Sequence, residues 1–165
     1  VNYLKEGFIA SIKIFTPVIP IAAFFFLGSE SAAAILGEGA APLLFDLGTA
    51  LANKLPLNSL FLAFGNLVIG IITGLDGSGF SGLPLTASLA EALGGPTGIN
   101  IPALAAVGQI GAVWSGGGTL TAWAFGLVAT AGVAGITPLE LARRNFVPVI
   151  SGLIVSTIFA VIVWM

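Results

Sequence analysis

The sequence predicts an all-helical integral membrane protein whose apolar segments are interrupted by two stretches rich in glycine and serine. Of its 165 residues, 57% are hydrophobic and only 7% are charged, whereas a soluble domain carries about 25% charged residues. With a mean hydropathy of +1.11, the chain has too few polar side chains to cover a surface facing water. We therefore expect a single multi-pass domain in a lipid bilayer, that of the bacterial cytoplasmic membrane.

Composition also excludes several classes of function. The net charge of −2 gives no basic surface for the phosphates of a nucleic acid. Because the chain has neither Cys nor His, thiolate nucleophiles, histidine bases and His-based metal sites are absent. No GxxxxGK[ST] phosphate-binding motif occurs. We expect no enzymatic activity and no cofactor, and any bound cation must be a hard one held by oxygen atoms.

The first half of the chain divides into three segments. Residues 8–28 are apolar and long enough to span a bilayer of about 30 Å. Residues 29–56 are more polar and are predicted to be extracytoplasmic or interfacial. Residues 57–94 consist of two short apolar arms around the sequence LDGSGFSG, at 75–82, and this pattern predicts a re-entrant hairpin that enters and leaves the membrane on one side.

The second half predicts a discontinuous transmembrane helix followed by a last span. The helix covers residues 97–133 and is interrupted at SGGG, residues 115–118. Residues 137–145 predict a short interfacial helix that begins with Thr137 as its N-cap. Residues 146–165 form a clean apolar span. Two to three full spans result.

Basic residues set the expected orientation, because they favour the cytoplasmic side. Lys5 and Lys13 lie near the start of the chain, and Arg143 and Arg144 precede the last span. An N-terminus in the cytoplasm and a C-terminus outside place all four inside and leave Lys54 outside. The hairpin then enters from outside.

The first interruption offers Asp76, Ser78 and Ser81, together with glycines such as Gly74 that expose backbone carbonyls. Non-helical backbone in the hydrocarbon layer persists only where it is buried in protein or lines a cavity. An ionisable residue at this depth indicates a functional site. The alternatives are that Asp76 caps a helix at the hairpin tip or lies in a loop exposed to water.

The second interruption offers hydroxyl groups and bare carbonyls, which are good ligands for Na⁺. The residues concerned are Ser115, Gly116, Gly117, Gly118, Thr119 and Thr121. Asn66 and Gln109 are further candidates to line the cavity, although hydrogen bonding between helices is the commoner role of such amides. Trp114 and Trp123 flank this interruption. The alternative is that the glycines only allow two helices to pack closely.

The order of these features resembles a known group of transporters. Residues 57–165 run as arm, LDGSG tip, arm with LPLTASLAEALG, half-helix, small-residue break, half-helix, amphipathic PLELARRN and final span. This order resembles the C-terminal half of ion transporter superfamily proteins, notably the large membrane subunit of tripartite ATP-independent periplasmic (TRAP) transporters and related dicarboxylate and citrate carriers. The chain departs from that family in having SGGGT where a Pro-Pro pair is usual.

The resemblance implies a sodium ion between the hairpin tip and the helix break, with the substrate beside it. Carried over, the cation-binding residues are Gly74, Asp76, Ser78, Ser81, Ser115, Gly116 and Thr119, and the substrate-lining residues are Asn66, Gln109, Gly117, Gly118 and Thr121. The family also has a second, inverted half that a chain of this length cannot contain. We therefore expect a second membrane chain or a homo-oligomer to supply it.

These observations predict a secondary transporter, or half of one, that moves a small organic anion together with Na⁺. Two other functions remain open. One is a cation/proton exchanger of the same architecture, with Asp76 as the titrating group. The other is a membrane assembly component without transport activity, in which the glycine-rich interruptions serve only for packing.

Overall fold

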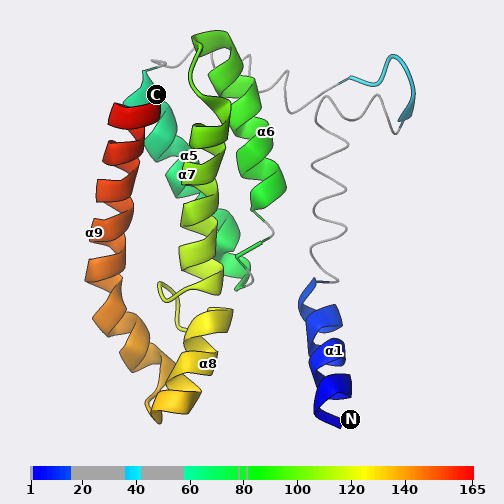
Figure 1. Ribbon diagram of the computed structural model, residues 1–165, viewed down its shortest axis with the longest axis vertical. Helices are drawn as coiled ribbons and strands as arrows, with labels where there is room; N and C mark the ends of the chain where they lie inside the picture. The colour runs from blue at the N-terminus through cyan, green and yellow to red at the C-terminus, as the bar shows by residue number, and fades with distance from the viewer. Residues whose placement is uncertain (1, 16–35, 42–57, 78, 81) are drawn as a thin grey trace.

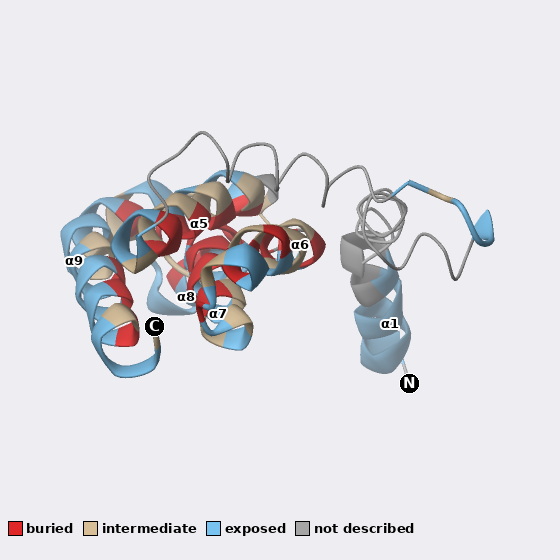
Figure 2. Cartoon of the chain, turned by 90° about the horizontal axis from the view of Figure 1, so that it is seen from above, coloured by how far each residue is buried: buried red, intermediate tan, exposed pale blue. Residues whose placement is uncertain are grey.

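The computed structural model describes residues 2–15, 36–41, 58–77, 79–80 and 82–165. Within these ranges the regular structure is entirely helical (Figure 1). The first helix, α1 (Asn2–Phe15), contains the start of the predicted span 8–28 and lies apart from the other helices in two views (Figures 1 and 2). The rest of that span and most of the segment 29–56 lie outside the described residues.

In the described part of the chain, a bundle of helices contains the two interruptions. Its elements are α5 (Ser59–Thr73), the 3₁₀ turn η1 (Gly74–Asp76), α6 (Leu83–Gly94), the 3₁₀ turn η2 (Gly95–Thr97), α7 (Ile101–Ala112), the π-helical turn η3 (Val113–Gly117), α8 (Phe125–Ala134) and α9 (Pro138–Trp164). In Figure 1, α5 and α7 run downward, α6 and α9 run upward, and α8 continues below α7. The helices α5 and α6 thus form an antiparallel helical hairpin within residues 59–94.

The core lies where α5, α6 and α7 face one another (Figure 2). Small residues allow the approach: a Cβ atom on Gly111 of α7 would lie 2.5 Å from the Leu67 carbonyl oxygen of α5, and one on Gly70 would collide with the backbone of Gly108. Such contacts are typical of helices packed within a bilayer, where close approach replaces the hydrophobic effect as the driving force. The long helix α9 packs on this core through Leu153 and Ala160.

Three helices begin with side-chain caps that the local sequence specifies. Asn58 accepts a hydrogen bond from the Phe61 N–H at 2.7 Å, Asn100 from the Ala103 N–H at 3.0 Å, and Thr137 from the Glu140 N–H at 3.3 Å. Each cap satisfies one of the amide groups that a helix leaves without an internal partner. The prediction of Thr137 as an N-cap is confirmed.

The C-terminal part differs from the prediction, because residues 137–145 and 146–165 do not form two separate helices. A single helix, α9, runs for 27 residues through Pro148. A proline inside a helix removes one hydrogen bond and bends the axis without necessarily ending the helix, and α9 changes direction in its first half (Figure 1). Among the described residues, α9 alone is long and apolar enough to cross a membrane.

Candidate functional site

The tip of the hairpin is an irregular segment between two helix ends. Helix α5 ends at Thr73, and η1 tightens the chain until Gly77, which has a φ of 88°. Gly79 also has a positive φ, of 74°, and α6 begins at Leu83. The two glycines fit these positions because side-chain-bearing residues rarely adopt such angles. The C-terminal end of α5 and the N-terminal end of α6 therefore meet at the tip.

The interruption of the second helix is wider than the SGGG sequence that predicted it. After Ala112 the helix widens into the π-helical turn η3, and α8 resumes only at Phe125. The intervening turn is held by its own hydrogen bonds: the Thr121 hydroxyl donates to the Ser115 carbonyl at 2.7 Å, and the Leu120 N–H donates to the Trp114 carbonyl at 3.0 Å. π-Helical turns of this kind occur frequently at functional sites.

The structure brings the two interruptions into direct backbone contact. A Cβ atom on Gly74 would collide with the Ser115 hydroxyl, and one on Gly116 would collide with the Gly74 carbonyl oxygen. A Cβ atom on Gly79 would lie 2.7 Å from the Gly117 amide nitrogen. Ser115 is completely buried, and its hydroxyl donates to the Ala112 carbonyl at 3.2 Å. Its oxygen lone pairs therefore remain as acceptors at the hairpin tip.

Hydrogen bonds also join the two segments, through carbonyl groups that the sequence suggested were bare. The donors are Trp123 Nε1 to the Leu75 carbonyl at 2.8 Å, the Phe125 N–H to the Gly77 carbonyl at 3.2 Å, and Gln109 Nε2 to the Gly79 carbonyl at 3.1 Å. Each of these carbonyl oxygens retains a second lone pair. The tip is thus hydrogen-bonded to residues around the second interruption at three alternate positions, 75, 77 and 79.

Two amide side chains have a buried oxygen atom without a hydrogen-bond donor in the described part of the structure. One is Gln109 Oε1, beside the tip, and the other is Asn66 Oδ1. Asn66 Nδ2 donates to the Leu104 carbonyl at 2.8 Å and to the Thr86 carbonyl at 3.2 Å, so that this side chain bonds three helices together. Because an unsatisfied buried acceptor costs about 1–3 kcal/mol, both oxygens are natural positions for a water molecule or a cation.

The predicted site residues divide into four groups. Those brought together at the contact of the two interruptions are Gly74, Ser115, Gly116, Gly117 and Gln109. Those nearby in the turn after η3 are Gly118, Thr119 and Thr121, whereas Asn66 lies further up the bundle between α5, α6 and α7. Ser78, Ser81 and the side chain of Asp76 lie outside the described residues.

The sequence indicated that Trp123 flanks the interruption but not that it bonds to the tip, and it gave no indication of a role for Phe125 or Gly126. Trp123 and Phe125 donate to the tip, and a Cβ atom on Gly126 would collide with the Gly117 carbonyl oxygen. The position of Trp123 just after the interruption was the available signal, but the direction of a side chain on irregular backbone cannot be read from spacing.

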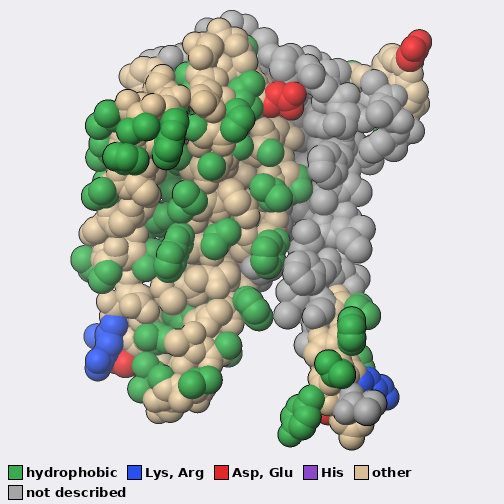
Figure 3. Space-filling view, in the orientation of Figure 1, with side chains coloured by type: hydrophobic (Ala, Val, Ile, Leu, Met, Phe, Trp, Pro, Cys, Tyr) green, Lys and Arg blue, Asp and Glu red, His purple; other side chains and the backbone are tan. Residues whose placement is uncertain are grey.

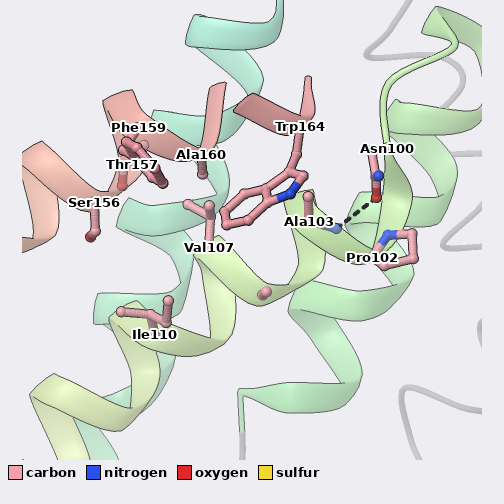
Figure 4. Close-up of a pocket in the computed structure, with 11 residues that line it drawn as sticks. Asn100, Pro102, Ala103, Val107, Ile110, Ser156, Thr157, Phe159, Ala160 and Trp164 are labelled. Atoms are coloured by element: carbon pink, nitrogen blue, oxygen red, sulfur yellow. Dashed lines mark hydrogen bonds between the residues drawn. The ribbon is translucent and has the colours of Figure 1, made fainter. Parts of the chain in front are cut away.

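Several cavities, referred to as hollows, lie around this contact and along α9. One of about 210 Å³ lies at the contact itself, lined by residues that include Gly79, Trp114 and Phe125. A larger one, of about 540 Å³, lies between α7 and α9 and is mostly apolar, with Val107, Phe159 and Trp164 among its lining residues (Figure 4). No pattern in the sequence indicated this second hollow.

Among the side chains that the structure describes, the charged ones of the bundle lie toward its ends (Figure 3). Glu140 forms an ion pair with Arg144 at 2.8 Å and lies 3.6 Å from Arg143, all in the first turns of α9. Among the described residues, no group of three or more His, Cys, Asp or Glu side chains is placed to hold a metal ion. The described side chains at the contact thus contribute hydroxyl and amide groups beside the backbone carbonyls.

Comparison with known proteins supports the membrane character of the chain. It is 44% identical over 164 residues to an uncharacterized membrane protein, YhfA, of Bacillus subtilis (strain 168). The alignment covers 97% of this chain and 35% of that protein, so the chain spans about a third of the length of the curated relative it matches. No protein-family description and no solved structure matches the chain.

Proposed function

We propose that this chain is part of a secondary transporter that moves a small organic anion together with Na⁺ across the bacterial cytoplasmic membrane. The observation that carries the proposal is the contact between the two helix interruptions, with the buried Ser115 hydroxyl against Gly74. Close packing alone accounts for the glycines. It does not account for the unsatisfied oxygen of Gln109 or for the π-helical turn beside it.

Helix lengths support the re-entrant and discontinuous arrangement. At 1.5 Å per residue, α5 and α6 are about 22 Å and 18 Å long, whereas a bilayer core is about 30 Å thick. The helices α7 and α8, of about 18 Å and 15 Å, are also too short individually. A hairpin that turns back within the membrane, and one helix broken into two halves, accommodate these lengths.

The position of the contact along α9 supports a site near the middle of the bilayer. Trp114, in the π-helical turn, lines a hollow of about 440 Å³ together with Pro148 and Gly152 of α9. These two residues lie near the middle of α9, which runs from Pro138 to Trp164. Transporters built from interrupted helices bind their substrates at this depth.

The groups at the contact suit a cation and an anion side by side. The C-terminal ends of α5 and of the α7 segment carry partial negative charge, and the N-terminal ends of α6 and α8 carry partial positive charge. Ser115 Oγ, Gln109 Oε1 and the carbonyl of Gly74 are the oxygen atoms that we assign to Na⁺. The N-terminal ends of α6 and α8 are assigned to the carboxylate of the substrate.

The missing inverted half is assigned to a further part of the protein, to a second membrane chain or to another copy. The relative in B. subtilis supports this, because only 35% of its length aligns with this chain. In the proposed orientation the N-terminus is cytoplasmic and the C-terminus is outside. The start of α5 and the end of α9 then share the outer side, in keeping with the 3.3 Å hydrogen bond from Ser59 Oγ to the Met165 carbonyl.

Uptake by proteoliposomes tests the proposal. The complete protein is reconstituted, and uptake of labelled dicarboxylates and citrate is measured with and without an inward Na⁺ gradient. We expect Na⁺-dependent uptake that Ser115→Ala reduces at least several-fold, while Gly152→Ala, at a position with nothing within 4 Å, leaves it unchanged. Asp76→Ala is measured in parallel.

Other outcomes would favour the other functions. Cation-driven proton movement without anion uptake, abolished by Asp76→Ala, would replace the proposal by a cation/proton exchanger. The absence of any flux from protein that is folded and inserted would favour an assembly component.

A further inference from the structure

The tip of the hairpin accepts hydrogen bonds from donors that belong to one neighbouring segment of the chain. The carbonyl groups of Leu75, Gly77 and Gly79 belong to alternate residues of the tip, and each accepts a hydrogen bond from the segment of residues 109–125. Bonds within the tip include those from the Gly77 N–H to the Gly74 carbonyl, at 3.1 Å, and from the Leu83 N–H to the Phe80 carbonyl, at 3.2 Å. The three bonds from the neighbouring segment add to these in holding the conformation of the tip.

Trp123 makes the shortest of these three bonds, at 2.8 Å. Its ring also covers the tip, because a Cβ atom on Gly77 would lie 3.3 Å from Trp123 Cδ1. The residue is 58% exposed, so the position of its ring is fixed by this hydrogen bond and by its backbone rather than by burial. The next residue, Ala124, is fully buried and its N–H donates to the Thr121 carbonyl at 3.1 Å, which anchors the backbone of Trp123.

We propose that Trp123 is a positioning residue for the cation site: its indole N–H clamps the hairpin tip against the interrupted helix, and release of this clamp opens the site. The inference rests on the proposed function for the identity of the site, but the clamp itself is a property of the fold. The exposed ring leaves without disturbing the core, whereas the buried residues around Ser115 stay in place. Breaking the Trp123 hydrogen bond thus requires less free energy than separating the buried residues of the contact.

Hydrogen exchange of the tip in the complete protein tests the clamp without reference to transport. Trp123→Phe keeps the aromatic ring and removes only the donor. Because a hydrogen bond of this kind contributes about 0.5–1.5 kcal/mol, we expect exchange of the amides of residues 74–83 to accelerate about 2- to 10-fold. The matched control is Trp114→Phe, since the Trp114 indole N–H makes no hydrogen bond within the described residues. Equal exchange in the unmodified protein and in Trp123→Phe, or equal acceleration in both variants, overturns the clamp.

Transport kinetics test the positioning role. In Trp123→Phe we expect the Na⁺ concentration for half-maximal uptake to rise about 2- to 10-fold while the maximal rate changes by less than about twofold. Gln109→Leu, which removes the donor to the Gly79 carbonyl, is expected to accelerate tip exchange in the same way. Unchanged Na⁺ dependence in Trp123→Phe overturns the positioning role. If the unmodified protein shows no uptake, the proposed function fails, and the exchange measurement still decides whether Trp123 clamps the tip.

Discussion

At the scale of single residues, glycines decide how closely the two interruptions approach. A Cβ atom on Gly116 would collide with the Gly74 carbonyl oxygen and the Gly79 amide nitrogen, and both obstacles are backbone atoms that cannot rotate away. We therefore expect Gly116→Ala to separate the two segments and to destabilise the protein by about 1–3 kcal/mol. Unfolding in mixed detergent micelles, followed by circular dichroism, measures this change.

Gly152→Ala is the control for this prediction, because Gly152 lies in α9 and a methyl group added there would have no atom within 4 Å apart from the backbone of its own helix and its chain neighbours. Alanine is favoured over glycine inside a helix by about 1 kcal/mol, so that this variant is expected to be as stable as the unmodified protein or slightly more so. Equal loss of stability in both variants would contradict the close approach at Gly116.

Asn66 is a single residue that stabilises the bundle through hydrogen bonds between helices. Its Nδ2 group donates to carbonyls of α6 and α7 at 3.2 Å and 2.8 Å. Asn66→Asp keeps the shape of the side chain but places an oxygen atom against these two carbonyl oxygens, and we expect a loss of about 1–3 kcal/mol in the free energy of unfolding. The same substitution at Asn58 is the control, because there the side-chain oxygen accepts from the Phe61 N–H at 2.7 Å and aspartate caps helices as well as asparagine. A similar loss at both positions would refute the bridging role.

Part of the candidate site could be predicted, because glycine-rich stretches in an apolar sequence indicate where the backbone leaves the helical conformation. Interruption of an apolar run by glycine and serine indicated which segments leave the helix, and Ser115 and Gly74 do meet. The sequence also left open whether Asn66 binds helices together or lines a cavity, and the structure shows the hydrogen bonds between helices. The hydrogen bond of Trp123 was not predictable, because it joins residues 48 positions apart through irregular backbone.

At the scale of elements, the helix start at Thr137 was predicted and one helix boundary was not. Thr137 and Asn100 carry the local signals of an N-cap, and both accept hydrogen bonds from the first turn of their helices. The continuity of α9 through Pro148 was missed. The charged start and the apolar remainder suggested two helices, but Glu140 pairs with Arg144 within one helix and the change of composition does not interrupt the backbone.

The cap of α9 gives a prediction at this scale. Thr137→Ala removes the acceptor for the Glu140 N–H, which is 3.3 Å from the Thr137 hydroxyl, and the loss of such a cap costs about 1 kcal/mol. We expect amide exchange in the first turn of α9 to accelerate about fivefold, with no change at the C-terminal end of the helix. Thr137→Ser retains the hydroxyl and is expected to exchange as the unmodified protein does. Identical exchange in the alanine and serine variants would show that the cap does not hold this end.

At the scale of the whole molecule, α9 is the element that relates the fold to the bilayer. Only 17% of its apolar 18-residue stretch is buried within the chain. A largely uncovered apolar helix about 40 Å long is stable in lipid or against other apolar helices, but not in water. Its arginines lie at one end, beside α8, and its other end lies beside the start of α5. In the proposed re-entrant arrangement, the orientation of α9 fixes the side from which the hairpin enters.

Thiol labelling in intact cells tests this orientation, and the chain suits the method because it contains no cysteine. Single cysteines replace Ile136, in the exposed turn before α9, and Met165, at its other end. Since basic residues favour the cytoplasm, we expect a membrane-impermeant maleimide to label the Met165→Cys protein in intact cells and the Ile136→Cys protein only after permeabilisation. The reverse pattern would place the hairpin on the cytoplasmic side. Labelling of both positions in intact cells would mean that α9 does not cross the membrane, and the proposed depth of the site would then be wrong.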